Sequence, residues 1–139
     1  MGTLLAGWAG KRYPRKWILS GIYAGRSISA IWFILTPITP NSVLIFSFAM
    51  GFLWLATVPL TSGLIAHIYG LKYMATLYGI VFFSHQLGSF TGVYIGGILY
   101  DSYGSYNLVW WVGIAAGILS ALIHIPIREE SRVKNLNKT

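Results

Sequence analysis

The sequence predicts an all-α integral membrane protein with four complete transmembrane helices and the end of a fifth. Composition is the first observation behind this fold class: 55% of the 139 residues are hydrophobic and only 9% are charged, against roughly 25% charged residues in soluble domains. The second observation is that four long segments each offer the roughly 20 apolar residues needed to cross a bilayer. The third is that the basic residues lie almost entirely between these segments, in alternate loops.

The first segment, residues 1–10, is apolar but too short to cross a membrane. A run of basic residues follows it, whereas a signal peptide carries its positive charge before the apolar stretch. We therefore interpret this segment as the end of a helix whose beginning is missing.

Four complete spans follow, and turn-forming residues mark the breaks between them. A cluster of Thr, Pro and Asn at residues 36–41 separates the first two spans. Pro59 lies inside the second span, where we expect a kink of the kind that membrane helices tolerate. The spans are predicted at about residues 17–35, 43–66, 74–100 and 108–127, so that residues 1–127 form a helical bundle and residues 128–139 a polar tail.

The positions of the basic residues orient the spans in the membrane. If the spans cross in alternation, nine of the ten Lys and Arg residues fall on one side, and the opposite loops at 37–42 and 101–107 hold none. Basic loops stay in the cytoplasm, so we expect a cytoplasmic C-terminus. The net charge of +7 is thus an orientation signal, and no domain carries a basic face suited to nucleic acid.

The third span carries a row of glycines that predicts close helix packing. Gly88, Gly92 and Gly96 recur at every fourth position and so share one face of a helix. In soluble helices such glycines cost about 1 kcal/mol each relative to Ala, but in a membrane they let a neighbouring helix approach closely. The neighbour is expected to be another helix of the protein or a second copy of the chain.

Two polar residues deep inside the spans are candidates for a solute or proton pathway. A charge such as Arg26 is costly inside a membrane and is a functional hypothesis by default; the alternative is a structural clamp on backbone carbonyls. His85 lies near mid-span. Histidine is the residue type that can change its charge near physiological pH, which suits proton coupling or an anion contact; the alternative is a hydrogen bond between helices. Gln86 is a further candidate, turned by about 100° from His85 on the helix, so that both cannot face one cavity squarely.

The second span provides a further polar face. Trp54, Thr57 and Thr61 are spaced three and four residues apart, so their side chains share one side of the helix. They are predicted to line a cavity for a small solute; the alternative is that they pack around the proline kink.

The residues that enzymes and metal sites require are missing from the spans. The acidic residues of the chain are Asp101, Glu129 and Glu130, all expected in a loop or in the tail, so no carboxylate pair is available for acid–base catalysis in the core. The three histidines are scattered and the chain has no cysteine, a set that does not make a metal site. We therefore expect no enzymatic activity, no metal and no cofactor.

One motif resembles that of a known family. Residues 7–16, GWAGKRYPRK, resemble the loop signature G-x-L-A-D-R-x-G-R-R/K of the major facilitator superfamily, which recurs between helices eight and nine of these transporters. The matching positions are Gly7, Arg12, Arg15 and Lys16. Lys11 stands where the family has the Asp of a latch between helix ends, and Pro14 stands where it has its second Gly.

The resemblance implies which part of such a transporter this chain represents. Residues 82–101 are similar to the eleventh helix of bacterial members, so the chain would hold the end of helix eight and helices nine to twelve. Its partners would be the lipid bilayer of a bacterial plasma membrane, the missing N-terminal helices and a small solute moved by alternating access. The resemblance favours the branch of monocarboxylate and oxalate/formate carriers, which hold a carboxylate with cationic residues in helices eight and eleven. The segment similar to helix eleven has no Lys or Arg here, so the class of solute stays open, with an organic anion as one candidate. The alternatives are a small membrane interaction protein and a nonfunctional truncation product, both without transport activity.

Overall fold

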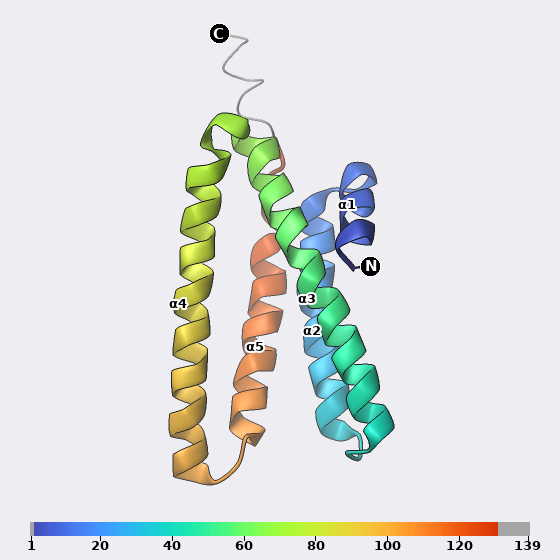
Figure 1. Ribbon diagram of the computed structural model, residues 1–139, viewed down its shortest axis with the longest axis vertical. Helices are drawn as coiled ribbons and strands as arrows, with labels where there is room; N and C mark the ends of the chain where they lie inside the picture. Colours follow the sequence, from blue (N-terminus) through green and yellow to red (C-terminus); the bar gives the residue numbers. More distant parts are fainter. Residues whose placement is uncertain (1, 131–139) are drawn as a thin grey trace.

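The computed structural model describes residues 2–130, and within that range it consists of five α-helices and no β-strand (Figure 1). The helices are α1 (Gly2–Arg12), α2 (Arg15–Leu35), α3 (Pro40–Tyr69), α4 (Leu71–Tyr103) and α5 (Asn107–His124). They correspond in order to the predicted helix end and the four predicted spans, which confirms the all-α fold. Residues 131–139 of the predicted polar tail lie outside the described residues.

Local sequence signals account for the ends of α3 and α4. A capping box opens α3: the backbone N–H of Ser42 donates to Thr39 Oγ1 at 3.1 Å, and the N–H of Thr39 donates to Ser42 Oγ at 2.9 Å. Pro40 takes the first helical position, where its missing N–H is not needed. Gly70 and Gly104 end α3 and α4 with φ values of 81° and 64°, which favour glycine because it has no Cβ.

The helices α2, α3 and α5 form one group, whereas α4 stands at the edge of the molecule (Figure 1). The short α1 packs against α3, and α2 packs against both α3 and α5. From its turn at Gly70, α4 diverges from α3 and runs the full height of the bundle. The α3–α4 turn lies at the same end as the segment after α5, while the α2–α3 and α4–α5 turns lie at the other end.

The tightest apolar packing joins α1, α2 and α3. Leu19 of α2 and Leu60 of α3 are each only 1% exposed, and they cluster with Ala6 and Ile22. A glycine of α1 permits the close approach, because a Cβ on Gly10 would lie 3.0 Å from Leu60 Cδ2. Small residues at helix contacts are the device by which membrane helices come together, and here they act in α1.

The predicted glycine ridge of α4 packs against another helix of residues 2–130 over only part of its length. A Cβ on Gly88 or Gly92 would meet no atom within 4 Å, whereas a Cβ on Gly96 would lie 3.7 Å from Val109 Cγ1 of α5. Only the Gly96 end of the ridge therefore packs within the chain, and close packing along the rest stays a prediction.

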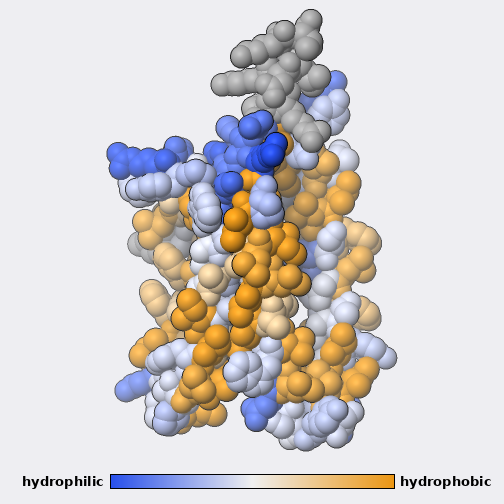
Figure 2. Space-filling view, turned by 180° about the vertical axis from the view of Figure 1, so that it is seen from behind, coloured by the Kyte–Doolittle hydropathy of each residue, from blue (hydrophilic) through white to orange (hydrophobic). Residues whose placement is uncertain are grey.

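Among the described residues, α2, α3 and α5 are long and apolar enough to cross a membrane, judged by length and composition. The helix α4 has 33 residues, but Ser84, His85, Gln86 and its glycines lower its mean hydropathy. A fourth crossing by α4 therefore stays a prediction. Figure 2 shows an apolar surface over the middle of the molecule and a concentration of hydrophilic residues towards one end, which is the surface of a bundle that faces lipid.

Candidate functional site

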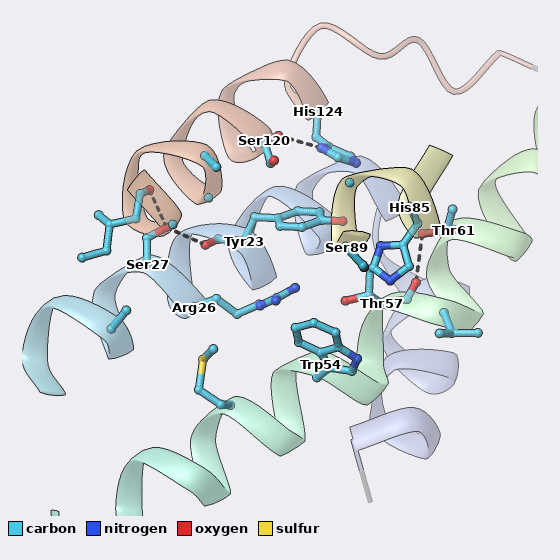
Figure 3. A pocket seen from close by; sticks show the side chains of 18 of the residues that line it. Tyr23, Arg26, Ser27, Trp54, Thr57, Thr61, His85, Ser89, Ser120 and His124 are labelled. Atoms are coloured by element: carbon cyan, nitrogen blue, oxygen red, sulfur yellow. Dashed lines mark hydrogen bonds between the residues drawn. The ribbon is translucent and has the colours of Figure 1, made fainter. Parts of the chain in front are cut away.

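A cavity of about 1090 Å³ lies between α4 and the group formed by α2, α3 and α5 (Figure 3). It exists because α4 diverges from α3, and side chains from all four helices line it. Its labelled residues in Figure 3 are Tyr23, Arg26, Ser27, Trp54, Thr57, Thr61, His85, Ser89, Ser120 and His124. Five of the six residues predicted for the pathway thus come together from three helices, and Gln86 is the one that does not line the cavity.

Arg26 of α2 supplies the positive charge of the cavity. Its guanidinium carbon lies 4.3 Å from the centre of the Trp54 ring on α3 and 5.8 Å from the centre of the Tyr23 ring. The side chain is half-buried and makes no hydrogen bond or ion pair with another residue of the range 2–130. The clamp on backbone carbonyls is therefore not formed among these residues, and a cation–π contact holds the guanidinium instead.

His85 faces the cavity from α4 and meets aromatic rings on two helices. Its ring centroid lies 6.3 Å from that of Trp54 on α3, at an interplanar angle of 64°, and 6.2 Å from that of Phe82 on α4. The imidazole has no hydrogen bond to any other part of the described chain. Its ring nitrogens are therefore available to a ligand or a proton.

The serine and threonine hydroxyl groups of α2 and α3 in the cavity, those of Ser27, Thr57 and Thr61, are already engaged with backbone carbonyls (Figure 3). Thr57 Oγ1 donates to the Leu53 carbonyl at 3.3 Å, and Thr61 Oγ1 donates to the Thr57 carbonyl at 3.0 Å. Ser27 Oγ lies 3.3 Å from the Ile114 carbonyl oxygen of α5. Because each hydroxyl has one hydrogen to donate, these residues mainly present lone pairs to the cavity.

His124 and Tyr23 are cavity residues that sequence reasoning did not select. His124 lines the cavity, with its ring centroid 5.0 Å from that of Tyr23. Its Nδ1 lies 2.7 Å from the Ser120 carbonyl oxygen, which can only accept, so Nδ1 carries the hydrogen and neutral His124 keeps a lone pair on Nε2. The four-residue spacing of Ser120 and His124 was a signal that both lie on one face of α5.

The residues of the loop motif lie outside the cavity. Arg15 at the start of α2 lies against α3, because a Cβ on Gly63 would be 3.3 Å from Arg15 Nε. The guanidinium carbon of Arg12 lies 5.2 Å from the centre of the Trp8 ring on α1. A Cβ on Gly7 would meet no atom within 4 Å.

The segment that follows α5 connects the ends of α2 and α3. The backbone N–H of Lys16 donates to Oε1 of Glu129, and the Lys16 ammonium donates to the Ile125 carbonyl at 3.3 Å. On α3, Nε2 of His67 lies 3.2 Å from the Glu129 carbonyl oxygen. The first N–H groups of a helix lack partners and carry positive partial charge, so a carboxylate stabilises the start of α2. Glu129 thus links the start of α2 to the end of α3. The family signature has an Asp that links helix ends, and this chain has Lys11 at that position.

Among residues 2–130, no group of three or more His, Cys, Asp or Glu side chains is placed to hold a metal ion. The acidic residues Asp101, Glu129 and Glu130 do not line the cavity. The cavity combines a cation, aromatic rings, imidazoles and hydroxyls in an apolar setting, which is the composition of a small-molecule binding site.

Long apolar helices around such a cavity are typical of helical membrane proteins that bind small molecules. The whole chain, residues 1–139, matches the family model described as Major Facilitator Superfamily. The chain therefore belongs to this family of membrane transporters, and its apolar helices are those of an integral membrane protein.

A curated relative is the uncharacterized MFS-type transporter YcxA of Bacillus subtilis (strain 168), which is 32% identical to this chain over 141 residues. The alignment covers 96% of this chain and 34% of the relative, so the chain spans about a third of that protein's length. No solved structure matches the chain.

Proposed function

We propose that this chain forms the C-terminal part of a secondary active transporter that moves a small organic anion by alternating access. The charge of the cavity is the observation that carries the proposal: Arg26 is the one Lys or Arg among its described lining residues, and no acidic side chain lines it. Family membership supports the transport activity. The resemblance to the monocarboxylate and oxalate/formate carriers supports an anion as the solute.

The C-terminal placement rests on the loop motif and on the helices that follow it. Residues 7–16 resemble the signature between helices eight and nine, and four helices come after them. In this arrangement α4 corresponds to helix eleven, crosses the membrane as the fourth complete span, and leaves the C-terminus in the cytoplasm. The α3–α4 turn and the segment after α5 share one end of the molecule (Figure 1), as this topology requires. The bacterial relative supports a bacterial plasma membrane as the location.

Alternating access requires two groups of helices that rock about a site near the middle of the membrane. The cavity between α4 and the α2–α3–α5 group is open and would be one side of such a site. The other side would come from helices equivalent to those in the part of the relative that this chain does not cover, which is about two thirds of its length. We therefore expect this chain alone to bind solute and not to transport it.

Solute counterflow into proteoliposomes tests the proposal. One preparation contains this chain alone, and the other contains this chain preceded by the corresponding N-terminal helices of the Bacillus relative. We expect the longer protein to accumulate a labelled organic anion and the chain alone to accumulate none. Accumulation of neutral or cationic solutes only, or of no solute by either protein, would contradict the proposal.

A second candidate is a small membrane protein that assembles through α4, favoured by the open space beside Gly88 and Gly92. An antibody against the C-terminal residues distinguishes it in native membranes. A band well above 15.4 kDa would support the longer transporter. A band near that mass, with no in-frame continuation in the DNA upstream of Met1, would support the small protein or a truncation product.

A further inference from the structure

We propose that the cavity selects a monocarboxylate with a flat, apolar body, and that Arg26, lying on the Trp54 ring, binds the carboxylate. This inference rests on the proposed function, because it narrows the organic anion to one chemical class. The charge of the cavity, its free hydrogen-bond donors and its aromatic lining each support it.

The charge of the cavity matches one carboxylate. Arg26 is half-buried and has no ion-pair partner in the range 2–130, so a single negative charge on the ligand neutralises it. A second carboxylate would find no second Lys or Arg among the described lining residues, and burying an unpaired charge is costly. The site therefore favours a monoanion over a dianion.

Arg26 and Trp54 both bring side-chain hydrogen-bond donors to the cavity lining. The guanidinium of Arg26 and the indole N–H of Trp54 have no hydrogen-bond acceptor in the described part of the chain. Thr57 and Thr61 donate their hydroxyl hydrogens to backbone carbonyls of α3, at 3.3 and 3.0 Å. A carboxylate only accepts hydrogen bonds, so the charged donors of Arg26 suit it better than the two threonines, which mainly offer lone pairs.

Aromatic side chains from every surrounding helix face the rest of the cavity. They come from Tyr23 on α2, Trp54 on α3, Phe82 on α4 and Trp110 on α5. Aromatic rings pair with other flat rings at centroid distances of about 4.5–7 Å, and such pairs contribute beyond the area they bury. A ligand with a flat apolar body fits between these rings, whereas acetate has no group to occupy the space.

Stacking on Trp54 prepares Arg26 for a carboxylate. A guanidinium is a planar fork that binds carboxylates through two parallel hydrogen bonds, and its contact at 4.3 Å with the ring restricts its orientation. A lysine at the same position would keep the charge but would lose the planar fork. Arg26 is therefore expected to contribute geometry as well as charge.

The test uses the full 139-residue chain in lipid nanodiscs, with isothermal titration calorimetry and benzoate as the probe. Acetate lacks the flat body, benzamide lacks the charge, and terephthalate adds a second carboxylate. We expect benzoate to bind saturably and each of the three analogues to bind at least tenfold more weakly. Empty nanodiscs measure the partitioning of benzoate into lipid.

Variants then assign the binding to Arg26. We expect Arg26→Gln to weaken benzoate binding at least tenfold and Arg26→Lys to weaken it less, because charge remains without the fork. Arg12→Gln is the matched control, since Arg12 also lies over a tryptophan ring, 5.2 Å from Trp8, but outside the cavity. It should leave the affinity unchanged. Helix content by circular dichroism shows that each variant is folded.

Three results would overturn the inference: no saturable binding of benzoate, benzamide binding as tightly as benzoate, or unchanged benzoate affinity in a folded Arg26→Gln chain. The counterflow assay separates this failure from that of the proposed function. Transport of a different class of anion by the longer protein would keep the proposed function and reject the flat monocarboxylate. Selective benzoate binding without any transport by the longer protein would keep the flat monocarboxylate as ligand and reject the proposed transport function.

Discussion

Ser27 of α2 and Gly117 of α5 meet where the two helices approach each other closely. A Cβ added to Gly117 would collide with the Ser27 hydroxyl and lie 3.6 Å from Ser27 Cβ. The same hydroxyl lies 3.3 Å from the Ile114 carbonyl oxygen and 3.2 Å from the Tyr23 carbonyl oxygen. The absent side chain of Gly117 is thus what allows Ser27 to be buried at 4% exposure with its hydroxyl partnered.

We expect Gly117→Ala to destabilise the chain, because overpacking a tight contact costs about 1–3 kcal/mol. Alanine has the higher helix propensity, but that gain is at most about 1 kcal/mol and does not offset the cost. Gly113→Ala is the matched control one turn earlier, where a Cβ would meet no atom within 4 Å; it should be neutral or stabilising. The measurement is the thermal unfolding midpoint in detergent. Adding Ser27→Ala to Gly117→Ala removes the colliding hydroxyl and should restore much of the lost thermal stability. Equal unfolding midpoints for Gly117→Ala and Gly113→Ala would refute the close contact.

The membrane crossing of α4 can be tested with reporter fusions. If α4 is a fourth span, a reporter at Asp101 and one after Lys138 should report opposite sides, with the C-terminal reporter in the cytoplasm. Its cytoplasmic end would carry Lys72, in keeping with the positive-inside rule. If α4 does not cross, the reporter at Asp101 should lie in the cytoplasm and the C-terminal reporter outside the cell, because α5 then crosses in the opposite direction. A C-terminal reporter outside the cell therefore rejects four spans.

Glu129→Gln should loosen the segment after α5 from the start of α2. The carboxylate accepts a hydrogen bond from the Lys16 backbone N–H, and charge-assisted bonds of this kind are roughly twice as strong as neutral ones. We expect amide hydrogen exchange at Lys16 to accelerate several-fold. Glu130→Gln removes the same charge from the neighbouring residue and is the control. Equal acceleration in both variants would mean that overall charge, and not the Glu129 contact, protects this amide.

His85 should matter for uptake by the longer transporter because its ring faces Trp54 in the cavity. We expect His85→Ala to reduce uptake at least tenfold at unchanged membrane expression. Gln86→Ala is the control, since Gln86 does not line the cavity. If His85 carries the coupled proton, His85→Gln should keep binding but remove the pH dependence of transport. Normal, pH-dependent transport by the Gln variant would reject the proton role.

The open glycine face of α4 predicts a partner outside the described residues. Gly92→Leu adds a side chain where a Cβ meets nothing within 4 Å, so helix content of the isolated chain should stay unchanged. Association with a second copy or with additional helices should fall, measured by cross-linking in membranes. Val93→Leu is the control, because Val93 is turned by about 100° on the helix. Equal cross-linking in both variants would contradict a specific ridge.

The helices and their order could be predicted because hydrophobic runs and turn residues are local signals. The span predicted at residues 17–35 is α2, Arg15–Leu35, and the span predicted at 43–66 is α3, Pro40–Tyr69. Helical periodicity also placed Trp54, Thr57 and Thr61 on one face, and all three line the cavity. Periodicity also turns Gln86 by about 100° from His85 on the helix, and of the two only His85 lines the cavity.

The pairings between helices could be learned only from the tertiary structure. The sequence marked Arg26 and Trp54 as separate candidates, but their contact at 4.3 Å depends on how α2 crosses α3. Likewise, Gly117 meets Ser27, while a Cβ on Gly92 would meet no atom of residues 2–130 within 4 Å, although both are glycines in apolar helices. Periodicity determines which residues share a face of a helix. What that face meets is set by the distances and crossing angles between helices, which depend on the interlocking of side chains along their whole length.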